Sequence, residues 1–245
     1  MFKAKVKAEV LKTILDAVST LVDEAKIQVT AEGISLKAVD PAHVAMVDLS
    51  IGKKAFADYK ATDMDMGVDL DKLKDILKLA GSSDLIEMEY KEDQHRLVFK
   101  IGHITRRMAL VDTANMGDPK VPNLNLPNQV TIVANELQQG IKASEAVSDH
   151  IALVAEGKSF ELVADGDTDQ VHLKLDAENL VKIQAPDKSR SLFSLDYFSN
   201  MSKVAKATDA ITLHLGTDYP VKFEFDIADG AGHIVYLLAP RIESE

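Results

Sequence analysis

The sequence predicts an α+β protein made of two tandem copies of one unit, and three observations lead to this fold class. The expected helices and strands follow the same order in both halves of the 245-residue chain. Short blocks of residues recur at nearly constant offsets between the halves. A proline-rich segment separates one half from the other. Together these features indicate a duplicated domain whose copies are joined by a connector.

The first half contains two helical patterns and six strand patterns. Apolar residues at helical spacing predict helices within residues 6–22 and 68–80. Asp71 is the expected N-cap of the second helix, and Gly81 is expected to end it. Alternating apolar and polar residues predict strands at 26–30, 34–39, 44–51, 85–90, 96–101 and 104–111.

The second half repeats this order. Helices are expected at 136–147 and 196–207, and strands at 151–154, 159–163, 210–215, 222–227 and 234–238. Residues 31–33 match 155–157 at an offset of 124. Residues 68–71 match 193–196, and residues 84–86 match 209–211, both at an offset of 125. Such nearly equal offsets predict a tandem duplication.

The segment from Asp118 to Asn128 is the predicted connector. Its three prolines fix φ, restrict the preceding residues to extended geometry and remove backbone donors, so the segment suits neither a helix nor a central strand. Leu124 and Leu126 are unexpected in an exposed spacer. They either attach the connector to the body of the protein or offer apolar surface to a partner. We expect domains at 1–116 and 130–245, joined by a connecting loop at 117–129.

The composition excludes several classes of protein. The chain has no cysteine, so disulfides and thiolate metal sites are ruled out. Its N-terminus lacks the apolar block of a signal peptide, and no run is long enough for a membrane span. These features favour the cytoplasm. A net charge of −11 and the absence of tryptophan argue against generic attraction to nucleic acid. Any role on DNA therefore requires positive charge concentrated in one place.

The charges are sorted between elements of the chain. Lysines recur on the predicted helices, and Lys78 and Lys203 occupy equivalent positions of the two repeats. Turns such as residues 63–65 and 165–169 hold much of the acid. The simpler interpretation of this pattern is that the helix faces are solvated. The alternative is a basic surface built from the helices.

The sequence contains no complete motif for catalysis or metal binding. The Gly157-Lys158-Ser159 run lacks the glycine that a phosphate-binding loop needs at position 152, where this chain has alanine. The aspartates at 165, 167 and 169 lack the glycine that a calcium loop needs at its sixth position. The histidines show no metal-ligand spacing. We therefore expect no catalytic residues, no metal and no cofactor.

Three separated blocks resemble the sliding DNA clamps, specifically the archaeal members of the proliferating cell nuclear antigen family. They are LKAVDPAHVAMV at 36–47, LHLGTDYPV at 213–221 and YLLAPRIESE at 236–245. The resemblance covers the whole chain and implies two clamp domains, with helices on one face and curved antiparallel sheets on the other. It further implies a homotrimeric ring around duplex DNA that acts as a processivity factor beside the nucleoid. The alternatives are one subunit of a heterotrimeric clamp, or an enzyme whose site is unrecognised.

The resemblance places lysines of the helices in the channel of the ring. The positions that match the family are Lys12, Lys78, Lys142 and Lys203. Helical facing adds Lys74 and Lys206. Ammonium groups attract phosphate without demanding one geometry, and phosphate contacts carry no sequence information. Such a channel would let the ring slide.

The resemblance also implies a pocket for short peptides from DNA polymerase, the clamp loader, flap endonuclease and DNA ligase. Matching positions are Val39, His43, Val44, Met46, Leu124, Leu126, Pro127, Pro220, Leu237, Ala239, Pro240 and Ile242. Leu237 departs from the tyrosine of animal relatives, so the anchor contacts are expected to differ in detail from theirs.

Subunit contacts are expected between two edge strands, at about 102–110 of one copy and 168–175 of its neighbour. Interface residues are expected to be Arg106, Arg107, Met108, Leu110, Glu145, Asp149, Val171 and Leu173. Opposite charges in this set would make assembly salt-sensitive.

Overall fold

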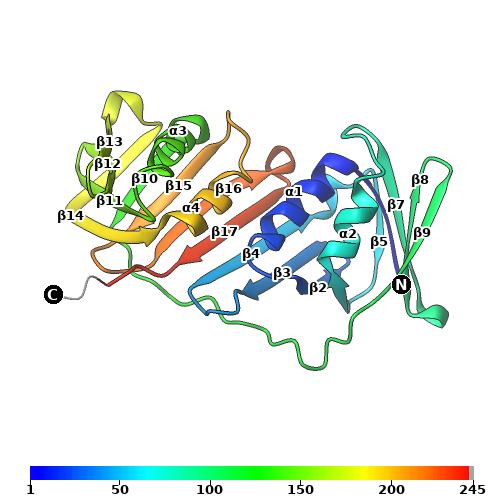
Figure 1. The fold of residues 1–245 in the computed structure, drawn as a ribbon. Helices are drawn as coiled ribbons and strands as arrows, with labels where there is room; N and C mark the ends of the chain where they lie inside the picture. The colour runs from blue at the N-terminus through cyan, green and yellow to red at the C-terminus, as the bar shows by residue number, and fades with distance from the viewer. Residues whose placement is uncertain (243–245) are drawn as a thin grey trace. The chain divides into compact units, whose positions relative to one another are not determined.

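The computed structural model describes residues 1–242, which form two compact units (Figure 1). The first unit comprises Met1–Lys120 together with Asp226–Ile234. The second comprises residues from 121 to 225 and from 235 onward. The described chain contains four α-helices, two in each unit, and the other regular elements are β-strands and short 3₁₀ turns.

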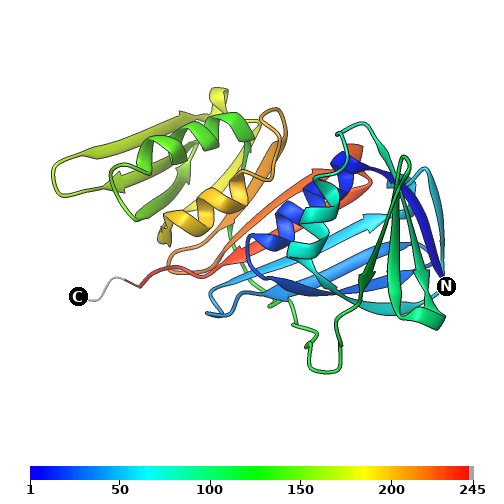
Figure 2. The ribbon, with the colours of Figure 1, turned by 45° about the vertical axis from the view of Figure 1, so that its right-hand side comes forward.

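The first unit contains helices α1 (Ala8–Ser19) and α2 (Leu70–Leu77). Its strands are β1 (Phe2–Lys7), β2 (Glu24–Thr30), β3 (Gly33–Val39), β4 (Ala45–Gly52), β5 (Asp58–Ala61), β6 (Met64–Asp69), β7 (Leu85–Lys91), β8 (Arg96–Ile101) and β9 (Ile104–Ala109). The antiparallel strand orders are β5-β1-β7-β8-β9 and β4-β3-β2-β6. In Figures 1 and 2, α1 and α2 lie side by side across these strands.

The second unit repeats the plan with helices α3 (Ala134–Ser144) and α4 (Leu195–Ser202). Its strands are β10 (Asn128–Val133), β11 (His150–Gly157), β12 (Ser159–Asp165), β13 (Gln170–Asp176), β14 (Lys182–Ser194) and β15 (Ala210–Leu215). The chain continues through β16 (Val221–Ile227) and β17 (Gly232–Leu238). The antiparallel order runs β13-β12-β11-β14-β10-β15-β16. Strand β13 is therefore an edge of this sheet, as β9 is in the first unit.

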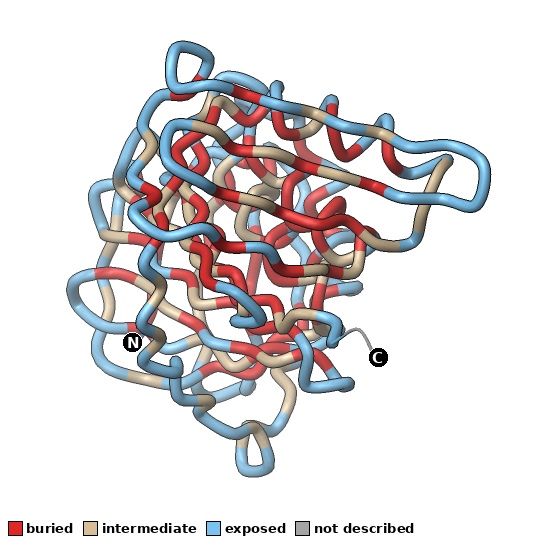
Figure 3. The backbone as a smooth tube through the Cα atoms, turned by 90° about the vertical axis from the view of Figure 1, so that its left-hand side faces the viewer, coloured by how far each residue is buried: buried red, intermediate tan, exposed pale blue. Residues whose placement is uncertain are grey.

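The cores explain why these segments fold as they do. Buried positions alternate with intermediate or exposed ones along many strands, as in β12 and β16, while the helices bury one stripe (Figure 3). In the second unit, Phe193, Phe198, Phe223 and Tyr236 are fully buried and form edge-to-face and stacked ring contacts. Aromatic pairs of this kind add stability beyond the area they bury. Each helix pair is thus held against its sheet by an apolar face, which leaves the opposite face to solvent.

The structure corrects several boundaries. Val6, expected in a helix, belongs to strand β1, and β5, β6, β10 and β14 were not anticipated. The expectation that Asp71 caps α2 is wrong, because the carboxylate of Asp69 accepts the hydrogen bond from the Lys72 amide at 2.9 Å. The helix also ends at Leu77, before Gly81. The helix predicted at 68–80 from the periodic pattern is therefore too long at both ends.

Candidate nucleic-acid and partner-peptide sites

The solvent face of α2 carries two lysines four residues apart. Leu73, Ile76 and Leu77 face the core, whereas Lys74 and Lys78 are exposed. Residues four apart on a helix lie on the same face, so these two ammonium groups form one basic stripe.

Acidic groups accompany this stripe. The ammonium of Lys78 lies 2.8 Å from a carboxylate oxygen of Asp75, and this hydrogen bond lowers the pKa of Asp75. On α1, desolvation raises the pKa of Asp16, against the opposing effect of Lys74 and Lys12 nearby. Exposed ion pairs are weak, so a phosphate can displace the carboxylate from such a lysine.

Lys12 differs from the other predicted channel lysines. Its side chain is only half-exposed, and its Nζ donates a hydrogen bond to the carbonyl of Ala80 at 2.7 Å. Ala80 follows the C-terminal end of α2. The ammonium group of Lys12 is therefore occupied within the first unit.

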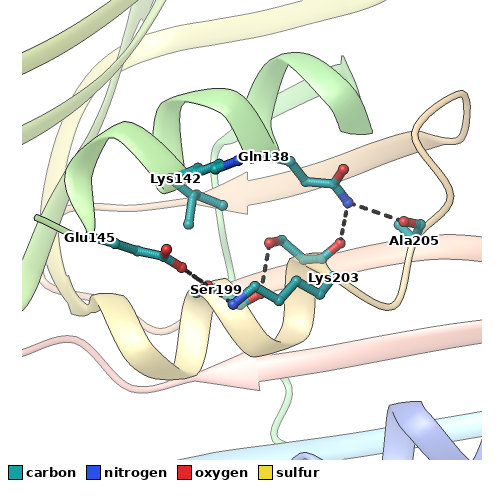
Figure 4. Close-up of a pocket in the computed structure, with 8 residues that line it drawn as sticks. Gln138, Lys142, Glu145, Ser199, Lys203 and Ala205 are labelled. Carbon is teal, nitrogen blue, oxygen red and sulfur yellow. Dashed lines mark hydrogen bonds and ion pairs between the residues drawn. The ribbon is translucent and has the colours of Figure 1, made fainter.

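In the second unit, α3 and α4 enclose a groove of about 400 Å³ (Figure 4). Glu145 Oε1 accepts hydrogen bonds from Ser199 Oγ at 2.7 Å and from Lys203 Nζ at 3.3 Å. These two hydrogen bonds lower the pKa of Glu145, and the bond from Ser199 has the larger effect. Lys142 lies on the same groove and is exposed. Lys206 is exposed beyond the end of α4. The predicted lysines of this unit thus gather on the solvent side of its helix pair.

One loop of the first unit holds part of the predicted peptide pocket. Asp40 is 2% exposed, and its carboxylate accepts hydrogen bonds from the amides of Ala42, Val44 and Ala45 at 3.0, 2.8 and 2.6 Å. His43 sits in this loop with φ of 58°. His43 and Val44 are exposed, whereas Met46 is buried. The carboxylate therefore fixes a tight loop that presents two of the predicted residues to solvent.

The connector follows a largely extended path with fixed points. Between β9 and β10 the described chain contains no helix or named strand. Asp118 forms an ion pair with Lys26 of β2 at 2.6 Å. Leu126 packs near Gly216, where an added Cβ would lie 3.5 Å from Leu126 Cδ2. Leu124 and Leu126 are both half-buried. The leucines therefore attach the connector and still leave apolar surface accessible.

The remaining predicted pocket residues lie in the second unit. Pro127 is exposed, whereas Pro220, Ala239 and Pro240 are half-exposed. Leu237 is buried and Ile242 is 85% exposed. Val39, which is half-exposed, and the other pocket residues of the β3–β4 region belong to the first unit. That both sets join in a single pocket stays a prediction.

The predicted subunit interface falls on strands with free edges. Arg106 and Arg107 are exposed on β9, and Val171 and Leu173 are half-exposed on β13. Met108 is 3% exposed, so its side chain serves the core of the first unit. The other predicted interface residues are half-exposed Leu110, exposed Asp149 and Glu145, whose carboxylate contacts Ser199 and Lys203. An unpaired edge offers backbone groups that a second chain can complete.

Three residues near these sites were missed from the sequence. Asp40 shapes the loop before β4, and Gln138 donates from α3 to carbonyls at and beyond the end of α4. Tyr219, like Leu126, lies within 3.5 Å of the position that a Cβ on Gly216 would occupy. The sequence offsets of 124 and 125 relate Lys12 to Glu136 and Leu137, so the repeat could not identify Gln138, which follows Lys12 by 126 positions. For Asp40, the signal is an aspartate before proline at the end of a strand.

Two features are absent from residues 1–242. These residues hold no group of three or more histidine or acidic side chains arranged to bind a metal ion. No helix among them combines the length and the apolar character needed to cross a bilayer.

Comparisons with known proteins agree along the whole chain. The family profile described as "Proliferating cell nuclear antigen, N-terminal domain" matches residues 1–116, and that for the C-terminal domain matches 120–241. Two relatives named DNA polymerase sliding clamp, from Methanocella arvoryzae and Methanococcoides burtonii, are 46% and 44% identical, with all of each chain covered. A solved structure of the C-terminal region of FEN-1 bound to A. fulgidus PCNA superimposes with a TM-score of 0.95, at 36% identity and full coverage of both chains. The chain therefore belongs to the proliferating cell nuclear antigen family.

Proposed function

We propose that this chain is a DNA sliding clamp, a non-catalytic processivity factor that closes as a homotrimer around duplex DNA. The observation that carries the proposal is the exposure of Lys78 and Lys203 at equivalent places in the two units. Both sit at the end of the second helix of their unit, although the chain as a whole has a net charge of −11. The names of the archaeal relatives support the same function.

The chemistry of the helix faces suits movement along DNA. Lys74, Lys78, Lys142, Lys203 and Lys206 are exposed lysines, which would meet phosphates as flexible point charges. The carboxylates beside Lys78 and Lys203 compete with phosphate for the same ammonium groups. Each contact with DNA would then be weak and quickly exchanged, while the closed ring keeps the protein in place. A strongly acidic exterior would discourage binding elsewhere.

Partner proteins would dock through the predicted peptide pocket. The related A. fulgidus protein was solved with the C-terminal region of FEN-1 bound. By similarity, this chain would hold replication enzymes and repair enzymes by short peptides with apolar anchors. The half-buried Leu124 and Leu126 would offer apolar surface to such a peptide. Buried apolar anchors of this kind commonly supply most of the binding energy.

Ring closure would use the free edges of β9 and β13. Antiparallel pairing of these strands from neighbouring copies would satisfy both rows of backbone groups. A native mass measurement tests this step, because a homotrimer has three times the mass of the chain. A protein that stays a monomer would instead point to one subunit of a heterotrimeric clamp.

The experiment for the DNA channel compares two fourfold lysine-to-alanine variants. One removes Lys74, Lys78, Lys142 and Lys203 from the helices. The control removes Lys60, Lys100, Lys158 and Lys182, which are exposed, lie outside the helices and come two from each unit. Affinity for a linear duplex is measured over a range of salt concentrations.

The helix variant should lose salt dependence, because each phosphate contact contributes about 0.9 to the slope of log affinity against log salt. The control variant should keep the slope of the unchanged protein. Equal slopes in the unchanged protein and the helix variant would refute the channel.

The peptide pocket is tested with Leu126→Asp. A carboxylate in place of this apolar wall should abolish binding of a FEN-1 C-terminal peptide and leave the oligomeric mass unchanged. Val121→Asp, at an exposed apolar residue of the same connector, is the matched control. Peptide affinity that survives Leu126→Asp would contradict the pocket.

A further inference from the structure

In both units a side chain of the first helix reaches the end of the second helix. Lys12 Nζ donates to the carbonyl of Ala80 at 2.7 Å. In the second unit, Gln138 Nε2 donates to the carbonyls of Ser202 and Ala205 at 2.7 and 3.1 Å (Figure 4). Ser202 is the last residue of α4, and Ala80 and Ala205 each lie three residues beyond the last residue of their helix. We call these donors caps, because each ties the segment that follows the second helix to the first helix of the same unit.

The two caps occupy equivalent places in the duplicated fold. Helices α1 and α3 begin at residues 8 and 134, an offset of 126, and the same offset relates Lys12 to Gln138. The accepting residues Ala80 and Ala205 are related by 125. The backbone bonds around the caps also repeat. They are Ala8 N to Asp84 O at 2.8 Å and Glu9 N to Ser82 O at 3.1 Å, and Ala134 N to Asp209 O at 2.8 Å and Asn135 N to Ala207 O at 3.0 Å.

The property that the two caps share is an N–H donor of sufficient reach. One repeat uses an ammonium and the other a neutral amide. Charge therefore cannot be the common requirement of this position. Lys12 is also only half-exposed, unlike Lys78 and Lys142. The ammonium of Lys12 is hydrogen-bonded to the segment that follows α2, whereas Lys78 and Lys142 extend into solvent.

We propose that the Lys12/Gln138 position is a positioning site that fixes the end of the second helix in each unit. By that role it holds the segments that carry Lys78 and Lys203. Lys12 then serves the DNA channel through its hydrogen bond to Ala80, and not by contacting phosphate. The part of this inference that concerns DNA rests on the proposed function, whereas the capping role does not.

The test exchanges the two caps and measures two independent quantities. Lys12→Gln places in the first unit the side chain that caps the second, and Lys12→Ala removes the cap. Lys142→Gln is the matched control for charge, since Lys142 is an exposed lysine on α3. For each variant the thermal midpoint is measured, together with the salt dependence of affinity for a linear duplex.

Lys12→Ala should lower the thermal midpoint by about 2–4 °C, as expected when a chain of this size is deprived of one hydrogen bond. Lys12→Gln should stay within about 1 °C of the unchanged protein. Lys12→Gln should also keep the salt slope, whereas Lys142→Gln should reduce it by up to about 0.9 for each phosphate that the lysine neutralises. Gln138→Ala should lower the midpoint as Lys12→Ala does, and Gln138→Lys should preserve it.

Two results would overturn the inference. Unchanged midpoints in both alanine variants would mean that the caps fix nothing. A fall in salt slope in Lys12→Gln equal to that in Lys142→Gln would mean that Lys12 neutralises phosphate itself. If the fourfold helix variant also keeps its slope, the channel itself fails, and the midpoints still decide whether position 12 is a cap.

Discussion

Replacing Asp40 with alanine should release the loop that presents His43 and Val44. The carboxylate of Asp40 accepts three backbone hydrogen bonds at 2.6–3.0 Å. One donor is the amide of Ala45, a buried residue, and the other two amides belong to exposed residues. His43 has a φ of 58°, which an unsupported loop would relax.

The free-energy cost of Asp40→Ala depends on which of the three amides are exposed to water. An unsatisfied buried donor costs about 1–3 kcal/mol, and each exposed hydrogen bond contributes about 0.5–1.5 kcal/mol. Allowing for the cost of burying the charge, we expect Asp40→Ala to destabilise the loop by about 2–4 kcal/mol. A local opening of that size speeds amide exchange by about 30-fold or more.

Hydrogen exchange at Ala42, Val44 and Ala45 measures this opening directly, and titration with a FEN-1 C-terminal peptide measures its effect on docking. We expect faster exchange confined to the loop, together with about tenfold weaker peptide binding. Asp48→Asn is the control, because its carboxylate makes only a 3.8 Å surface pair with Lys37. Unchanged protection of the Ala45 amide in Asp40→Ala would refute the reasoning.

Two further predictions concern the second unit. A hydrogen bond from His214, with Lys222 adding to it, lowers the pKa of Glu224 from 4.5 to about 2. Because the folded pKa is the lower one, the stability this carboxylate contributes is present above pH 4.5 and is lost as the pH falls toward 2. Urea unfolding over that range should show a shallower pH dependence in Glu224→Gln, and an unchanged dependence would contradict the assignment. An added Cβ at Gly140 of α3 would lie 2.7 Å from Leu173 Cδ2, so Gly140→Val should destabilise the protein by about 1–3 kcal/mol in the same assay. Adding Leu173→Ala should recover part of that loss, and strictly additive effects would show that the two sites do not touch.

Much of the architecture could be predicted because the same sequence pattern occurs in both halves of the chain. The matched blocks at offsets near 125 identified equivalent helices, and the proline segment identified the connector. Strand β1 was missed because it runs directly into α1, with no turn between them and no side-chain N-cap at Lys7. The periodicity of the helix therefore extended back into the strand. Strand β14 was missed because its 13 residues include a proline and a polar run that break the alternation.

The exposure of most of the helix lysines could be predicted from the sequence, but the hydrogen-bond partner of each one could not. Helical facing places Lys74 and Lys78 on one solvent stripe, since both follow from the spacing of the buried residues. The hydrogen bond of Lys12 to Ala80 depends on how α1 and the segment after α2 pack together, and this tertiary contact cannot be read from the sequence. The same holds for Asp40, whose hydrogen bonds depend on the conformation of the five residues that follow it.

The residues that hold each helix pair in place differ from the exposed residues that would contact a ligand. Backbone bonds such as that from Ala8 to Asp84, with the apolar stripes beneath, set where the helices lie. The side chains of residues such as Lys74 and Lys142 take no part in that framework. They can therefore be substituted without changing the fold. The same duplicated frame could then be given a bare, neutral lining to suit an uncharged polymer.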